Sequence, residues 1–386
     1  MVSRSFAIVG AGFSGAVVAR QLAEAGHQIT VFDTRPHVAG NCFTKRHETG
    51  VLVHVYGPHI FHTQHEHVWN FITRFGVMKA YRHTVSAMSG GKKYQLPMNL
   101  TLINDFFGTN FTPEQAEAFI TEKADKTITH PVSFEDQALR FVGRELYEAF
   151  FKGYTKKQWG EEPTALPASI LARLPLRFTA DDSYFNHPFQ GIPEHGYTPI
   201  VEAILDHPSI TVHLSTAFNP SGAHAYDHVV WTGPIDAFFG FAHGRLGYRT
   251  LDFVQEVHEG DVQGCPVLNY CDESVPYTRI TEHKHFAPWE HHDKSVTYTE
   301  YSRLCTEADT PYYPIRLVEE KDQLVKYVER ARAQQGVTFL GRLGTYRYLD
   351  MDVTIHEALN AASGMLDALA RDSAIPSFFT DPLGGA

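Results

Sequence analysis

Three glycines near the start of the chain have the spacing of a phosphate-binding turn. Gly10, Gly12 and Gly15 follow a short apolar run at residues 6–9 and open a segment whose apolar residues have helical spacing. Gly10 permits a tight turn, Gly12 lets the backbone approach a pyrophosphate, and Gly15 allows close helix–strand packing. A pyrophosphate bound there would lie at the positive end of the helix.

An acidic residue completes this pattern. Asp33 ends a second apolar run at residues 28–32, where its carboxylate can accept a hydrogen bond from a ribose hydroxyl. The strand–helix–strand context favours a dinucleotide site over a glycine turn buried in a core. A basic turn with a glycine, from Arg35 to Asn41, follows Asp33 and favours FAD over NAD.

Residues 341–352 form a second candidate for cofactor binding. They stand just before an apolar stripe at residues 353–369 that predicts a C-terminal helix. The N-terminus of a helix carries a partial positive charge, which would stabilise an anionic reduced flavin. The alternative is an ordinary surface turn.

Residues 150–198 combine many aromatic side chains with several arginines. Aromatic rings suit stacking on a base or a sugar, and the arginine fork suits a diphosphate. Taken alone, the aromatic residues fit a packed core better than a binding site.

The elements that must position these residues belong to a mixed α/β chain of 386 residues. Apolar runs predict buried strands at 6–9, 28–32, 209–215, 227–232 and 338–341. Helical spacing predicts helices at about 64–82, over most of 100–180, at 317–334 and at 353–369. Alternation over 247–304 predicts an antiparallel sheet.

Composition narrows the function classes. The net charge of −11 disfavours nucleic acid, whose phosphates are bound by lysine and arginine. The apolar runs are too short for a membrane span, and the N-terminus has no signal-peptide pattern, so we expect a cytoplasmic protein. The four cysteines are scattered, and we expect the histidines at 283, 285, 291 and 292 to be ordinary, so no metal site is predicted.

Taken together, the motifs resemble the bacterial form of the UDP-galactopyranose mutase family over about residues 5–370. Besides the motifs above, the resemblance includes the blocks Tyr56–His62, Lys152–Trp159, Tyr184–His187, Phe189–Pro193, Thr232–Asp236, Tyr277–Phe286, Glu300–Ser302 and Tyr312–Ile315. The chain departs from the family at Asp33, where glutamate is usual, and at Ala39, where glycine is usual.

The resemblance implies a discontinuous Rossmann-like FAD-binding domain with an inserted helical domain and an antiparallel β-sheet domain. The implied ranges are 1–82, 196–240 and 335–372 for the FAD domain, 100–195 for the helical domain, 83–99 and 241–334 for the sheet domain, and 373–386 for a loose tail. A mobile substrate loop is implied near 160–180.

The implied activity is a redox-neutral interconversion of UDP-galactopyranose and UDP-galactofuranose, which supplies galactofuranose for cell-surface glycans. The implied cofactor is noncovalent FAD, which in its reduced form attacks the anomeric carbon. An electron donor such as NAD(P)H or reduced flavin, and a homodimeric assembly without membrane or nucleic-acid partners, complete the expectation.

Residue roles are carried over from the same resemblance. The implied catalytic residues are two diphosphate arginines, two hydrogen-bonding tyrosines and a histidine beside the flavin: Arg173, Arg279, Tyr313, Tyr348 and His62. The implied substrate-binding residues are Phe150, Tyr154, Trp159, Tyr184, Asn186, Arg249 and Asn269. The implied cofactor-binding residues are Gly10, Gly12, Phe13, Ser14, Gly15, Asp33, Gly40, Asn41, His59, Val212, Thr232, Arg342, Tyr348, Asp350 and Met351.

Three alternatives remain at this point. Arg177 competes with Arg173 for the role of mobile arginine. An amine oxidase-like FAD oxidoreductase would share the glycine turn and the C-terminal return. A non-catalytic binding protein, similar to the Rab GDP-dissociation inhibitors, would share the fold without the chemistry.

Overall fold

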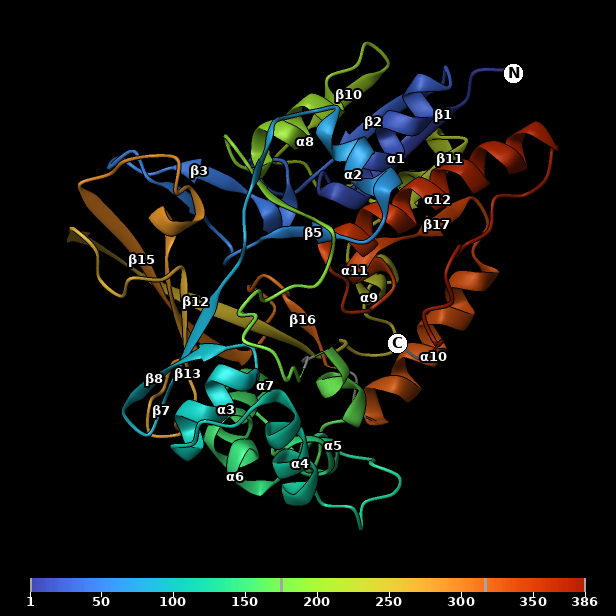
Figure 1. Cartoon of the computed structure of the whole chain (residues 1–386). Helices are drawn as coiled ribbons and strands as arrows, with labels where there is room; N and C mark the ends of the chain where they lie inside the picture. The colour runs from blue at the N-terminus through green and yellow to red at the C-terminus, as the bar shows by residue number, and fades with distance from the viewer. Residues whose placement is uncertain (1, 174–175, 316–317, 385–386) are drawn as a thin grey trace.

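A five-stranded parallel sheet carries the N-terminal glycine turn (Figure 1). Its strands in spatial order are β10 (Ile210–His213), β2 (Gln28–Phe32), β1 (Ser5–Val9), β11 (His228–Trp231) and β17 (Val337–Phe339). All neighbouring strands run parallel. The order reverses between β1 and β11, which is where open α/β sheets bind ligands, outside the carboxyl ends of their strands. The predicted strands and the α/β class are confirmed.

The computed structural model describes residues 2–173, 176–315 and 318–384; within these ranges the side chains of residues 169, 172, 173 and 318–320 lie outside the description.

Helices cover both faces of the parallel sheet because its strands alternate their side chains. Phe6 and Ile8 point to a core shared with α1 (Phe13–Glu24), α8 (Tyr197–Leu205) and α12 (Met351–Ala370). Ala7 points to the opposite core.

That opposite core also contains residues of α9 (Ile235–Phe238) and α10 (Val318–Ala333). The sequence grouped residues 318–333 with the antiparallel sheet. In the structure, Leu324, Tyr327 and Val328 pack with Val229 of the parallel sheet. Helix α10 therefore packs on the parallel sheet, unlike the grouping expected from the sequence. The boundaries between the expected domains stay a prediction.

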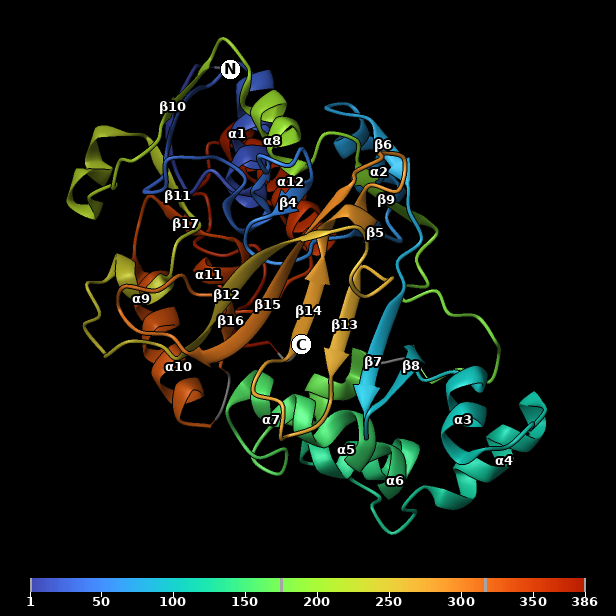
Figure 2. The ribbon, with the colours of Figure 1, turned by 90° about the vertical axis from the view of Figure 1, so that its left-hand side faces the viewer.

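A seven-stranded sheet stands beside the parallel sheet (Figure 2). Its strands in order are β16 (Tyr313–Pro314), β12 (Tyr248–Glu259), β15 (Lys294–Leu304), β14 (Arg279–Glu282), β13 (Val267–Tyr270), β7 (Val85–Ser89) and β8 (Lys92–Leu96). Its pairs are antiparallel except for β13 with β7. The antiparallel strands predicted over 247–304 are confirmed.

Helices between β8 and β9 form their own apolar core. They are α3 (Leu100–Phe107), α4 (Pro113–Lys123), α5 (Phe134–Val142), α6 (Arg144–Leu146), a π-helix (Tyr147–Lys152), α7 (Gly153–Trp159) and a 3₁₀ turn (Ala168–Arg173). Thr112 and Ser133 form capping boxes that start α4 and α5. The mobility expected near 160–180 stays a prediction, and residues 174–175 lie outside the described residues.

Two small sheets complete the fold, and one of them corrects the helical range expected at 64–82. Helix α2 covers only Glu66–Thr73 of the range 64–82, because β6 (Met78–Ala80) pairs with β9 (Phe189–Pro193). Strand β9 lies within residues 100–195, the range implied for the helical domain, and also pairs with β5 (Phe61–Thr63). Strands β3 (Thr44–Arg46) and β4 (Leu52–His54) form a separate hairpin-like pair.

The C-terminal segment is held where a loose tail was expected. The carbonyl of Ser377 accepts a hydrogen bond from the amide of Phe339 at 2.8 Å, and the carbonyl of Pro376 accepts one from the Thr338 hydroxyl at 2.7 Å. Phe378 packs on the core beneath α10. Pairing alongside β17 therefore orders residues that composition alone marked as free.

Candidate functional site

One cavity of about 1040 Å³ runs from the carboxyl ends of the parallel sheet to the seven-stranded sheet and the helical segment. This volume is at the upper end of the roughly 300–1,000 Å³ typical of small-molecule sites. Its lining includes the last residues of β1, β2 and β11, which are Val9, Phe32 and Trp231. The cavity therefore begins where the fold favours a dinucleotide and continues well beyond that point.

The three motif glycines differ in what fixes them. A Cβ on Gly10 would lie 2.0 Å from the Thr232 hydroxyl, and Gly10 has a φ of +111°. A Cβ on Gly15 would lie 1.9 Å from the Gly10 carbonyl oxygen. A Cβ on Gly12 would come no nearer than 3.8 Å to Gly40. The fold itself requires Gly10 and Gly15, whereas Gly12 leaves open space on the cavity side of the turn.

Asp33 and Arg35 stand next to this turn. The Asp33 carboxylate accepts hydrogen bonds from the amides of Ala11 at 2.8 Å and Arg35 at 2.9 Å. Each carboxylate oxygen keeps a lone pair for a ribose hydroxyl. The Arg35 guanidinium lies 4.7 Å from the centre of the Tyr56 ring and donates to Asn41 at 2.8 Å. Its Nη1 is buried without a hydrogen-bond partner in the described part of the chain.

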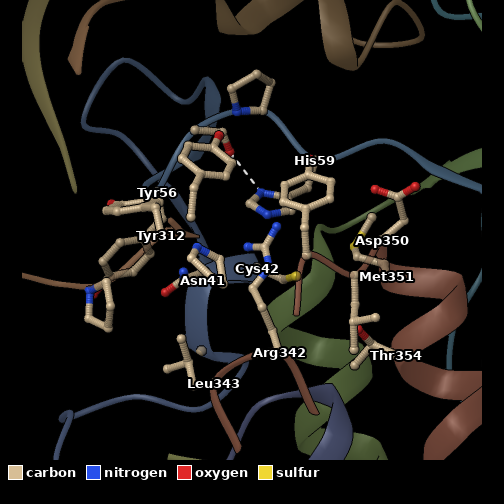
Figure 3. Close-up of a pocket in the computed structure, with 18 of the residues that line it drawn as sticks. Asn41, Cys42, Tyr56, His59, Tyr312, Arg342, Leu343, Asp350, Met351 and Thr354 are labelled. Carbon is tan, nitrogen blue, oxygen red and sulfur yellow. Dashed lines mark hydrogen bonds between the residues drawn. The ribbon is translucent and has the colours of Figure 1, made fainter. Parts of the chain in front are cut away.

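Arg342 supplies a second such donor. Its guanidinium points toward His59 (Figure 3) and lies 4.7 Å from the centre of the Tyr348 ring. Its Nε is buried and has no partner among the described residues. Two orphaned guanidinium donors beside an open glycine turn fit an anionic pyrophosphate, since a buried donor without a partner costs about 1–3 kcal/mol. The residues present therefore fit a dinucleotide such as FAD.

His59 and the start of α12 border the same space (Figure 3). His59 Nδ1 lies 2.9 Å from the Gly57 carbonyl oxygen. Burial, together with the charges of Arg342 and Arg279, lowers the pKa of His59 to about 4 despite the hydrogen bond to Gly57, so the ring is neutral near neutral pH. Met351 and Thr354 of α12 line the cavity, so a partial positive charge faces its contents.

Arg279 lies at the other end of the cavity. It is the first residue of β14 and pairs in register with Glu300 of β15. Its Nε donates to Glu300 Oε2 at 2.8 Å, and the Glu300 residue is 1% exposed. Burial opposes the charge of Arg279, but the Glu300 carboxylate raises the pKa of Arg279 well above its usual value. A fixed cation therefore faces the cavity.

Tyrosines surround this cation. The rings of Tyr313 and Tyr348 stack with centres 5.7 Å apart, and Trp159 lies 6.4 Å from Tyr313. Burial raises the pKa values of Tyr154 and Tyr313. These phenols therefore keep their protons and can donate hydrogen bonds to an anion.

Two buried amides lie among aromatic residues at the same end. The Oδ1 of Asn269 and the Oε1 of Gln158 have no hydrogen-bond partner in the described residues. Phe150, 5% exposed, and Tyr154 line the cavity with them. Amide oxygens beside rings suit the donor groups of a stacked base.

His62 lies between the two ends. Its Nδ1 is 2.8 Å from Nδ1 of His187, and its ring stacks on Phe185 with centres 3.6 Å apart. Burial lowers the pKa of His62, against the opposing charges of Asp350 and Asp352.

Most of the expected site residues line this one cavity. The lining residues are Gly10, Gly12, Phe13, Ser14, Asp33, Gly40, Asn41, His59, His62, Phe150, Tyr154, Trp159, Tyr184, Thr232, Asn269, Arg279, Tyr313, Arg342, Tyr348, Asp350 and Met351.

Four expected residues do not line the cavity. Gly15 packs against the Gly10 carbonyl, and Val212 pairs with Val31 within the sheet. Asn186 is exposed. Arg249 is buried behind the cavity, where its Nε lies 3.2 Å from both the Gln158 carbonyl and the Ser302 hydroxyl.

The two competing arginines stand differently. The backbone of Arg173 ends the 3₁₀ turn, but its side chain lies outside the described residues. Arg177 donates to the Ser183 carbonyl at 2.6 Å and pairs with Asp181 at 3.2 Å. It is not among the lining residues.

Sequence reasoning missed Gln158 and Arg35 as individual site residues. Gln158 stands beside Trp159 in the aromatic block, where surrounding aromatics concealed a single polar side chain. Arg35 follows Asp33 by two residues, and that spacing could have identified it.

The chain also has no described helix with the length and apolarity to cross a membrane.

The sheet and the cavity define the class: a Rossmann-like dinucleotide-binding protein whose site continues onto a buried arginine and tyrosines. Sequence models match an NAD(P)-binding Rossmann-like domain at residues 8–75 and UDP-galactopyranose mutase at residues 149–348. A Klebsiella pneumoniae protein named probable UDP-galactopyranose mutase is 55% identical over 98% of this chain and 99% of its own length. The chain belongs to the UDP-galactopyranose mutase family, whose members are isomerases.

Two further likenesses refine this result. The dTDP-fucopyranose mutase of Escherichia coli is 51% identical over 92% of this chain and 96% of its own length. A crystal structure of a reduced UDP-galactopyranose mutase matches with a TM-score of 0.74 at 16% identity, over 95% of this chain and 96% of the other. At that identity the structural likeness shows the shared fold.

Proposed function

We propose that this chain interconverts UDP-galactopyranose and UDP-galactofuranose without net redox change. The observation that carries the proposal is the single cavity that joins the open glycine turn to Arg279 and its tyrosines. A nucleotide sugar needs both a cation for its diphosphate and rings for its base, and the far end of the cavity offers both. The 55% identical relative supports the same substrate.

Noncovalent FAD is the proposed cofactor, held by Gly12, Asp33, Arg35 and Arg342. The open space at Gly12 and the two orphaned guanidinium donors support this assignment. When bound and reduced, FAD supplies the nucleophile for the anomeric carbon of the sugar. His59, being neutral, adds no charge to this environment.

Arg279 and the tyrosines are proposed to act on the diphosphate. The bond between the anomeric carbon and the diphosphate oxygen breaks, and negative charge grows on the leaving group. Arg279 neutralises that charge from a position that Glu300 fixes beforehand. Tyr313 and Tyr348 donate hydrogen bonds to the same oxygens, and the same bond re-forms to the five-membered ring. Arg173 is proposed as a second diphosphate cation.

The nucleotide base is proposed to lie between Phe150 and Tyr154. The buried Asn269 and Gln158 oxygens would accept hydrogen bonds from it. Trp159 and Tyr184 would border the sugar and exclude water from the reacting carbon.

The setting of the enzyme is part of the proposal. We expect a homodimer in the cytoplasm that receives electrons from NAD(P)H or a reduced flavin, and whose product feeds cell-surface glycans. The four cysteines are free thiols, which supports a reducing compartment. We also propose the division of the chain into three domains. Light scattering of the purified protein tests the dimer.

A second substrate is favoured by a specific observation. The 51% identical relative is named a dTDP-fucopyranose mutase, so dTDP-fucopyranose is the alternative nucleotide sugar. Both sugars require the same diphosphate contacts and differ at the base, the ribose and the sugar's C6.

One assay separates these proposals. The purified protein is reduced with dithionite and given each nucleotide sugar, and the furanose product is quantified by chromatography. We expect conversion of UDP-galactopyranose by reduced enzyme and none by oxidised enzyme. Faster conversion of dTDP-fucopyranose than of UDP-galactopyranose would identify dTDP-fucopyranose as the substrate. Oxygen consumption with net sugar oxidation would favour an oxidase, and a colourless inactive protein would favour a binding function.

A further inference from the structure

Three histidines from distant parts of the chain meet outside the cavity. His65 precedes α2 at the N-cap position, His67 lies in the first turn of α2, and His356 lies on α12. One ring nitrogen of each lies within 4.8 Å of those of the other two. His67 Nε2 and His356 Nδ1 are 2.8 Å apart, and the rings of His65 and His356 stack at 4.5 Å. In the sequence His356 follows His67 by 289 residues.

We propose that this His65–His67–His356 cluster binds a divalent transition metal, with Zn²⁺ as the best fit. Three imidazole nitrogens and one water complete the tetrahedral shell that zinc prefers in three-histidine sites. Neutral imidazole is the form that coordinates the ion, and the pKa of His356 is lowered by burial and by its two histidine neighbours. Nitrogen ligands also disfavour Mg²⁺ and Ca²⁺, which prefer oxygen.

A polar neighbour can orient one ligand. Asn360, one helical turn after His356, has its amide nitrogen 3.0 Å from His356 Nε2. If Nδ1 of His356 holds the metal, Nε2 carries the proton and donates it to the amide oxygen of Asn360, whose amide can face either way. Histidine ligands in metal sites are commonly oriented by such a partner.

A second group of possible metal ligands consists of Asp261, Glu282 and His285. We call it the saturated group, because hydrogen bonds and ion pairs within the protein already occupy its ligand atoms. Glu282 accepts hydrogen bonds from the amides of Val262 and Gln263 and from the hydroxyl of Ser295, and it lies 3.5 Å from His285. Lys284 lies 3.8 Å from Asp261 in the same group. A lysine and three internal donors supply the positive partners that a metal would otherwise provide, so we expect this group to serve the loop structure.

Metal at the histidine cluster would connect α2 to α12. The first turn of α12 contributes Met351 and Thr354 to the cavity lining, and His356 follows within the next turn. The ion would therefore fix the helix whose N-terminus faces the cofactor space. It would bind at the surface, since His67 is exposed, and would take no part in the reaction.

The test uses the full-length, FAD-loaded protein without a polyhistidine tag. Calorimetric titration with Zn²⁺ is expected to give one site per chain, and Co²⁺ is expected to give the visible absorption of a tetrahedral complex. His67→Ala, which removes an exposed ligand, should weaken binding by at least the roughly 10–100-fold that loss of a ligand's hydrogen-bonding partner costs, and should abolish that absorption. His356→Ala should do the same, and Mg²⁺ should give no binding heat.

Two control variants locate the ion. His291→Ala removes a histidine whose side chain is 96% exposed, and it should bind as the unmodified protein does. His285→Ala disrupts the saturated group and should also leave binding intact. Unchanged affinity in His67→Ala, loss of binding in His285→Ala, or no Zn²⁺ binding by the unmodified protein would each overturn the proposal. Flavin absorbance confirms that each variant is folded.

Discussion

The two ends of the cavity are built in different ways. At the end proposed to hold the cofactor (the cofactor end), neighbouring residues and backbone geometry form the surface: a glycine turn, strand ends and helix N-termini. At the end proposed to bind the nucleotide sugar (the substrate end), side chains from separate strands and helices converge, as Arg279, Tyr313 and Phe150 do. The first kind of surface depends on the absence of a side chain at a glycine. The second kind depends on the packing of distant strands and helices, which brings their side chains together.

The largest effect is expected at the cofactor end, from Gly12→Val. The backbone of Gly12 is extended, and an added Cβ meets only ordinary contacts in the protein. The variant should therefore fold but fill the space that the pyrophosphate needs, and we expect loss of bound FAD and of all activity. Flavin absorbance after purification measures occupancy.

Two further glycines sharpen this prediction. Gly15→Ala places a Cβ 1.9 Å from a carbonyl oxygen. The resulting strain should reduce the free energy of unfolding by about 1–3 kcal/mol and so lower the melting temperature. Gly222→Val stands in open space away from the cavity and should change neither property. Full FAD occupancy in Gly12→Val would show that the cofactor lies elsewhere.

The next effect is expected at the substrate end, from Arg279→Ala. Loss of a charge-assisted contact made in the transition state costs about 3 kcal/mol, or roughly a hundredfold in rate. Arg279→Lys keeps the positive charge beside buried Glu300 but lacks the guanidinium fork. Its turnover should therefore fall between those of the unmodified protein and Arg279→Ala. Turnover of reduced enzyme is the measurement, with FAD occupancy checked in each variant.

Arg303→Ala is the matched control for Arg279. Arg303 lies on the neighbouring strand β15 and pairs with Asp252 and Asp309 at the surface. Its loss should change turnover less than a few-fold. Arg177→Ala, outside the cavity lining, should do likewise. Near-normal turnover by Arg279→Ala would contradict the proposed diphosphate site.

A smaller effect is expected from Tyr313→Phe. Removing one hydroxyl deletes a single hydrogen bond of about 1–1.5 kcal/mol, which is roughly tenfold in rate. Tyr301→Phe, on β15 and not among the lining residues, is the control. Rates that are equal for the two variants would remove Tyr313 from the diphosphate contacts.

The last expected effect concerns the folding stability of the sheet beneath the cofactor end and leaves the cavity itself unchanged. Burial lowers the pKa of His228 on β11 to about 4, against roughly 6.5 in the unfolded chain. The unfolded state therefore binds more protons between these values, so the stability from this group is present above about pH 6.5 and is lost as pH falls toward 4. Between about pH 7 and 5 the loss is about 2 kcal/mol.

Urea unfolding at the two pH values measures this loss. His228→Asn cannot titrate, so its stability should fall less between them than that of the unmodified protein. His291→Asn, which replaces an exposed histidine, should follow the unmodified protein. An unaltered pH dependence in His228→Asn would show that this buried ring does not contribute.

The sequence predicted local features well and non-local ones less well. The strands and the turn before α1 follow from contiguous apolar runs and glycines. Residues 78–80 were expected in a helix and residues 189–193 within the helical domain, yet they pair with each other as strands across more than a hundred residues. No local pattern records such a partner. The same reason explains why the tail beside β17 is ordered.

Among the site residues, the sequence by itself determined the glycine turn, Asp33 and the family of the chain, because each depends on residue types in a fixed order. Only the tertiary structure decided which side chains face the cavity: Arg249 lies behind it and Asn186 outside it. It also brought His356 to the start of α2. Convergence of side chains depends on how elements pack, and that information is distributed over the whole chain.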